Sequence, residues 1–205
     1  MDAPGSVFFP TPPPPPSTGE ACPGLQTSEI LGREAWLGSV ALGFAFRGES
    51  RHRIDQKGRV SVPAEFRKGI ICGDPDYQIG ANASFTIVYG DSRMTCLKCY
   101  TEQSIRDIDE AIELMDLASE SRRFLEFFYQ TKSFKAQLDP AGRFVLPAVL
   151  KSKTRINGDV WFAGTGASFE MWNLENYEAH CSRLEAQFRD GDSALDPRSL
   201  LQADL

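Results

Sequence analysis

The chain has 205 residues, 41% of them hydrophobic, which suits one compact domain or two small units that share a core. The net charge of −6 argues against a nucleic-acid partner unless the basic residues are locally concentrated, because phosphate binding needs clustered Lys and Arg. Five cysteines, an odd number, argue against a disulfide framework and favour a reducing cytoplasm.

The first 45 residues differ from the rest in composition. Eight of the thirteen prolines lie in residues 1–23, five of them in the run 12–16. This composition favours extended polyproline conformation and predicts a disordered leader over 1–45. Binding of the proline-rich run to an aromatic groove of a partner is the alternative. The longest apolar run, 35–46, is too short to span a bilayer, so we expect no membrane partner.

A repeat follows the leader. Residues 53–64 align with residues 137–148 at an offset of 84 without a gap, and Asp, Gly, Arg, Pro and Ala recur at matched positions. We therefore predict one unit over 46–128, a second over 129–190, and a polar tail over 191–205.

Both units predict the same order of elements. Two strands flank a turn, and Pro63 or Pro147 then opens a short helix. A hairpin comes next, formed by 85–89 with 94–100 in the first unit and by 160–163 with 168–172 in the second. An amphipathic helix closes each unit. The apolar faces of these helices are Ile105, Ile108, Ile112 and Met115, then Leu174, Tyr177, Cys181, Leu184 and Phe188. One unit buries little surface alone, so an α+β fold is expected in which both units close one pseudo-twofold β-barrel with flanking helices.

The repeated turn has a defined chemistry. Asp139-Pro-Ala-Gly142 is typical of a type I turn, and Asp55-Gln-Lys-Gly58 has the same end residues. Gly58 and Gly142 are predicted to adopt positive φ. Arg59 and Arg143 follow directly. Each arginine either pairs with the turn aspartate or binds a phosphate or guanine edge, and the first role does not exclude the second.

Basic side chains are concentrated around both turns. Residues 46–68 hold seven basic and three acidic side chains, and residues 129–153 hold five and one, whereas residues 107–116 are acidic. Arg51 and Arg53 share one strand face. In the second unit, Gln137 and Ala141 stand where Arg53 and Lys57 stand in the first. The DNA-binding residues predicted from this pattern, with the first unit dominant, are Arg51, Arg53, Lys57, Arg59 and Arg143.

The run 46–48 and the two Asp-x-x-Gly-Arg turns, each leading into Pro-Ala, resemble the MraZ family of the SpoVT/AbrB-like, swapped-hairpin superfamily. The resemblance extends from about 46 to 188. It implies two tandem swapped-hairpin units and assembly into ring-shaped homo-oligomers. It also implies a cytoplasmic, nucleoid-associated protein that binds tandem repeats in the promoter of the cell-division and cell-wall gene cluster, usually as a repressor. The proline-rich leader and Ala141 depart from the family pattern.

Other chemistry is less well supported. Cys96 and Cys99 form a lone CxxC that would point to opposite faces of a strand, and the chain has two histidines, His52 and His180, so we expect no metal or cofactor. We find no nucleophile–His–acid set or phosphate-binding glycine loop, so neither an enzyme nor a small-molecule substrate is expected. The alternative functions are an antitoxin-like module that sequesters a partner protein through its acidic helix and tail, and a purely structural oligomer.

Overall fold

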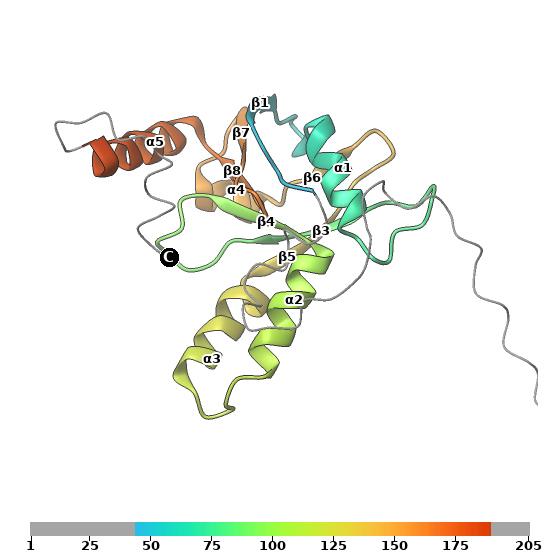
Figure 1. Cartoon of the computed structure of the whole chain (residues 1–205). Helices are drawn as coiled ribbons and strands as arrows, with labels where there is room; N and C mark the ends of the chain where they lie inside the picture. The colour runs from blue at the N-terminus through green and yellow to red at the C-terminus, as the bar shows by residue number, and fades with distance from the viewer. Residues whose placement is uncertain (1–43, 190–205) are drawn as a thin grey trace, which may run out of the picture. The chain divides into compact units, whose positions relative to one another are not determined.

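The computed structural model describes residues 44–189 and has a mixed α+β fold (Figure 1). Six antiparallel strands form one sheet in the order β1-β7-β8-β4-β3-β5, and β2 pairs with β6 in a two-stranded sheet. The strands are β1 (Glu49–Arg53), β2 (Arg59–Ser61), β3 (Ser84–Val88), β4 (Leu97–Thr101), β5 (Ser133–Gln137), β6 (Arg143–Val145), β7 (Asp159–Gly164) and β8 (Phe169–Trp172).

The sheets interleave the two copies of the repeat. The predicted offset of 84 residues relates β1 to β5 and β2 to β6 without a gap. The first strand of each copy pairs with the third strand of the other, so β1 lies beside β7 and β5 lies beside β3. The strands β4 and β8 also pair across the copies, as do β2 and β6. Neither copy therefore completes its own sheet.

Within residues 44–189, five α-helices and one π-helical segment accompany the sheets. Pro63 and Pro147 directly precede α1 and α4, as predicted, with φ of −52° and −57° that suit a helix start. The side chain of Thr101 caps α2 by accepting a hydrogen bond from the Ser104 backbone N–H at 3.1 Å. The helical elements are α1 (Ala64–Cys72), α2 (Glu102–Glu113), α3 (Glu120–Leu125), the π-helical η2 (Glu126–Thr131), α4 (Ala148–Thr154) and α5 (Leu174–Arg189).

The core is aromatic and draws on both copies. Phe85 and Phe169 are fully buried with ring centroids 5.8 Å apart, and Phe66 packs on Phe169 at 5.2 Å. Phe144 of β6 meets Phe85 of β3 edge-on at 5.2 Å. Because each copy supplies only part of this cluster, each copy buries its apolar surface chiefly by packing against the other copy.

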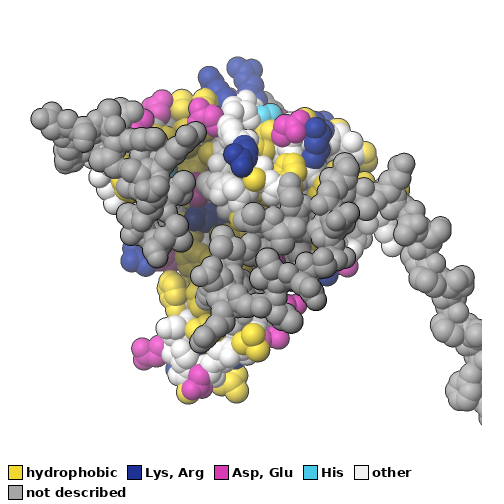
Figure 2. Space-filling view, viewed as in Figure 1, with side chains coloured by type: hydrophobic (Ala, Val, Ile, Leu, Met, Phe, Trp, Pro, Cys, Tyr) yellow, Lys and Arg dark blue, Asp and Glu magenta, His cyan; other side chains and the backbone are white. Residues whose placement is uncertain are grey.

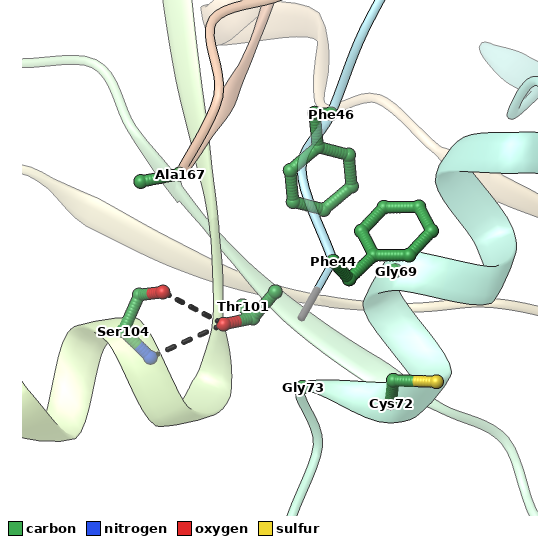
Figure 3. A pocket seen from close by; sticks show the side chains of 8 residues that line it. All are labelled: Phe44, Phe46, Gly69, Cys72, Gly73, Thr101, Ser104 and Ala167. Atoms are coloured by element: carbon green, nitrogen blue, oxygen red, sulfur yellow. Dashed lines mark hydrogen bonds between the residues drawn. The ribbon is translucent and has the colours of Figure 1, made fainter. Parts of the chain in front are cut away.

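The structure describes two residues of the predicted leader, Phe44 and Ala45. Phe44, assigned from sequence to the disordered leader, is half-buried and meets Phe46 edge-on at 5.3 Å. Both rings lie against α1 at Gly69, beside the pocket that Gly73 and Thr101 help to line (Figure 3). The rest of the predicted leader, and the predicted tail over 191–205, lie outside the described residues.

The predicted hairpins and closing helices are present, with two differences. The pairs β3–β4 and β7–β8 are antiparallel, and α2 and α5 follow them. The helix α2 ends before Met115, which had been included in its apolar face. The segment α3–η2 was not predicted; it runs back beside α2 and forms a helical hairpin that extends away from β1 and α1 (Figure 1). No helix within residues 44–189 has the length and apolar character needed to cross a membrane.

Candidate functional site

The two repeated turns have nearly identical backbone geometry. Gly58 N donates to Asp55 O at 2.9 Å, and Gly142 N donates to Asp139 O at 2.8 Å. Both glycines adopt the predicted positive φ, +79° and +73°. An added Cβ on Gly58 would lie 2.9 Å from the backbone oxygen of Leu146, so this close approach also requires glycine.

Each turn aspartate holds the arginine four residues later. Asp55 Oδ1 accepts from the Arg59 backbone N–H at 2.8 Å, and Oδ2 accepts from Arg59 Nε at 2.6 Å. Asp139 contacts Arg143 in the same way, at 2.9 and 3.0 Å. The backbone N–H and the guanidinium lower the pKa of each carboxyl below its ordinary value. The predicted ion pairs are therefore present, and the side chains of Arg59 and Arg143 stay 42% and 44% exposed.

Pairing of β2 with β6 brings the two turns onto one two-stranded ribbon. Arg59 lies opposite Val145 and Ser61 lies opposite Arg143, while the residues between them, Val60 and Phe144, are buried in the core. Each strand continues past the other copy's turn: Val62 N donates to Gly142 O at 3.0 Å, and Leu146 N donates to Gly58 O at 2.8 Å. The alternation of two therefore puts Arg59, Ser61, Arg143 and Val145 on one outward face.

Three further predicted residues lie on or near β1. Arg51 and Arg53 are exposed on the same strand face, as expected, and Lys57 is exposed at the first turn. Arg51 Nη2 donates to Asp159 Oδ2 at 2.6 Å. Asp159 lies on β7 and was not predicted as a partner from the sequence. Its carboxylate partly neutralises the charge of Arg51, and Arg51 in turn lowers the pKa of Asp159. Within the described residues, neither Lys57 nor Arg53 forms an ion pair.

Arg67 is one of the seven basic residues within 46–68, but it is not among the residues that the sequence predicts to bind DNA. It extends from α1 of the first copy to the second turn, where Nη1 donates to Ala141 O at 3.5 Å. Its Cζ would lie 2.9 Å from a Cβ built on Gly142, so the guanidinium rests over that glycine. No sequence signal pointed to this contact, because its partners are 74 residues away.

Charge is divided between two parts of the described chain. Lys and Arg side chains gather over β1 and α1, whereas Asp and Glu, with exposed apolar side chains, are prominent on the α2–α3 hairpin (Figure 2). Residues 102–131 of that hairpin hold eight acidic and three basic side chains. The predicted concentration of basic residues is thus visible over β1 and α1 of the first copy. In the second copy, Lys135 Nζ pairs with Glu102 at the start of α2 and Lys153 Nζ donates to backbone oxygens before β4, so its basic side chains are less concentrated at the turn.

The CxxC cysteines lie on opposite sides of the sheet, as predicted. Cys96 packs with Ala163 and Trp172, whereas Cys99 belongs to the main core cluster. Burial raises the pKa of the Cys96 thiol to about 12 and that of Cys99 well above its ordinary value. Both thiols are therefore protonated at neutral pH and poor ligands for a metal ion. Among residues 44–189 no group of three or more His, Cys, Asp or Glu is arranged to hold one.

Comparison with known proteins gives a consistent result. The family model described as "MraZ protein, putative antitoxin-like" matches residues 130–198. A relative named transcriptional regulator MraZ from Ruegeria pomeroyi is 41% identical over 133 residues, which cover 65% of this chain and 80% of the relative. Relatives of the same name from Ruegeria sp. strain TM1040 and Cereibacter sphaeroides ATCC 17025 are 40% and 38% identical over 155 and 148 residues. These cover 76% and 69% of this chain, and 89% and 87% of the relatives.

Proposed function

Since this chain belongs to the MraZ family of transcriptional regulators, we propose that it binds double-stranded promoter DNA through the β2–β6 ribbon and the two turns beside it. The observation that carries this proposal is the outward face of the ribbon, where Arg59 and Arg143 are both exposed and each is oriented by an aspartate. A two-stranded ribbon fits the major groove, and an oriented guanidinium matches the O6 and N7 acceptors of guanine.

The other predicted residues have supporting roles in this proposal. Arg53 and Lys57 bind phosphate groups, and Arg51 does so with its charge reduced by Asp159. The second turn has Ala141 where the first has Lys57, so the first copy contributes more of the affinity. The turns keep their shape through the remaining predicted residues, which are Asp55, Gly58, Pro63, Asp139, Gly142 and Pro147.

We further propose that the units 46–128 and 129–190 are swapped-hairpin units that close one pseudo-twofold barrel. Backbone hydrogen bonds at the turns support closure, because Asp55 N donates to Arg59 O and Asp139 N donates to Arg143 O. These bonds join β1 to β2 and β5 to β6, so the β2–β6 ribbon connects the two edges of the six-stranded sheet. Closure of this kind would leave no exposed sheet edge for unwanted pairing.

The resemblance supports a finer proposal about the target and the assembly. In it, the cytoplasmic protein forms a ring-like homo-oligomer that binds tandem repeats upstream of the cell-division and cell-wall gene cluster and represses it at the nucleoid. One ribbon offers few phosphate contacts and binds weakly alone. Several ribbons on repeated DNA boxes gain about 10²- to 10⁴-fold in avidity without new contacts.

A gel-shift titration on the DNA upstream of the chain's own gene tests the site. Arg59→Ala should weaken binding by roughly 5- to 150-fold, since a bidentate arginine–guanine contact contributes about 1–3 kcal/mol of discrimination. Arg143→Ala should weaken it less. Arg106→Ala, on the acidic hairpin, is the matched control and should leave binding unchanged. Wild-type affinity in a folded, oligomeric Arg59→Ala variant would refute the assignment.

One observation favours a second candidate function, sequestration of a partner protein. Leu114 and Leu117 are 90% and 77% exposed at the turn of the acidic helical hairpin. Exposed apolar side chains bordered by charge are typical of protein-binding surfaces. Under this function the double variant Leu114→Ser, Leu117→Ser would lose the partner, and the arginine variants would bind it normally.

A further inference from the structure

Val145 stands out on the outward face of the β2–β6 ribbon. It is 56% exposed, while its neighbours in sequence, Phe144 and Leu146, are buried. It lies opposite Arg59 in the register of the two strands. Its Cγ1 would also lie 3.8 Å from a Cβ built on Gly58. A residue of the second copy therefore borders the first turn and its arginine.

Packing of the core does not explain why an apolar side chain stands at position 145. The apolar side chains that fill the core from this ribbon are those of the opposite face, Val60 and Phe144. The position related by the 84-residue offset is Ser61, which lies opposite Arg143. The two halves of the ribbon face are therefore unlike: an arginine beside a valine in one half, and an arginine beside a serine in the other.

We propose that Val145 contacts the 5-methyl group of a thymine in the base pair next to the one bound by Arg59. This inference rests on the proposed DNA-binding function and deepens it. Thymine is the only base that presents a methyl group in the major groove, and an apolar side chain is what discriminates it. At the related position the Ser61 hydroxyl accepts or donates a hydrogen bond and has no such preference. The pseudo-symmetric ribbon therefore binds an asymmetric site.

The test removes the methyl group from the DNA and the valine from the protein in turn. In the upstream duplex bound by the wild-type protein, each thymidine is replaced singly by deoxyuridine and affinity is measured. One replacement should weaken wild-type binding by about fourfold, the factor expected for the burial of one methyl group. Val145→Ser should bind the unmodified duplex about fourfold more weakly and should lose nothing further at that thymine.

Val149 provides a matched control. It is 76% exposed on α4, outside the ribbon, so Val149→Ser should keep the full sensitivity to deoxyuridine. Melting curves of the three proteins check that the folds are equal. The inference is overturned if the wild-type protein binds the duplex specifically but no thymine shows a methyl effect that Val145→Ser removes. It is also overturned if Val149→Ser removes the effect. Absence of specific binding by the wild-type protein would instead overturn the proposed function, and this inference with it.

Discussion

One carboxylate organises each turn. Asp55 accepts hydrogen bonds from both the backbone and the guanidinium of Arg59, so a single side chain fixes the turn and the direction of the arginine. An exposed ion pair of this kind adds little to the free energy of unfolding. Its benefit lies in binding, because an arginine that is already oriented loses less conformational entropy when it contacts DNA.

The lowered pKa values of the turn aspartates make this contact sensitive to acid. The pKa of Asp55 and of Asp139 in the folded protein lies below the ordinary 3.8. The small contribution of each aspartate–arginine contact to the free energy of unfolding is therefore fully present above pH 3.8, and it is lost as the pH falls through the lower pKa of the folded protein. In an NMR titration, the amides of Arg59 and Arg143 should shift with midpoints below 3.8.

The second turn is the internal control for the first. Asp55→Asn should remove the acid titration at the Arg59 amide and leave that at Arg143 unchanged. Midpoints at or above the ordinary aspartate value, or loss of both titrations in Asp55→Asn, would show that these carboxylates do not hold the arginines.

Among the helices and strands, those with local signals were predicted and those without were not. The hairpins β3–β4 and β7–β8 and the helices after Pro63 and Pro147 follow from turn residues and proline. The segment α3–η2 was missed because its apolar residues, Phe124, Leu125, Phe127 and Phe128, are nearly continuous. Continuous apolar residues show no helical period, and a π-helix departs further from the period of 3.6.

The candidate site was predicted in its residues but not in its arrangement. The turn residues and Arg59 and Arg143 are local features of the repeat. Arg59 and Arg143 lie on one ribbon because β2 pairs with β6, a strand 84 residues away. A single sequence without homologues does not indicate which distant strands pair. The contact of Arg51 with Asp159, across 108 residues, was missed for the same reason.

The packing of α1 at Gly69 against Phe44 and Phe46, which precede β1, gives a prediction about stability. An added Cβ on Gly69 would lie 2.6 Å from Phe44 Cδ1 and 2.7 Å from Phe46 Cε1 (Figure 3). Alanine improves helix propensity by about 1 kcal/mol, but overpacking costs about 1–3 kcal/mol. Gly69→Ala should therefore lower the free energy of unfolding in urea by up to about 2 kcal/mol.

A second substitution separates packing from helix propensity. Phe44→Ala removes the more exposed of the two rings, so Gly69→Ala should cost less in that background than in the wild type. An equal cost in both backgrounds, or a more stable Gly69→Ala protein, would show that Phe44 does not pack on Gly69.

Over the whole molecule, the charge arrangement reconciles an acidic chain with a DNA partner. At physiological salt the Debye length is about 8 Å, so a phosphate bound at the exposed Arg59 and Arg143 responds mainly to the charges close to it and less to the net charge of the whole chain. The net charge of −6 then reflects the hairpin and the rest of the chain more than the binding surface. Such a distribution favours approach of DNA by the basic side.

Salt dependence measures how many basic side chains bind phosphate. About four phosphate contacts predict that log K falls with log salt at a slope of about −3.6, and Lys57→Ala should reduce this to about −2.7. Arg106→Ala removes the same charge from the hairpin, where it pairs with Asp76, and should leave the slope unchanged. If both variants change the slope equally, net charge and not the turn controls binding. A slope near zero would favour the partner-sequestering function, because a protein partner releases few condensed counterions.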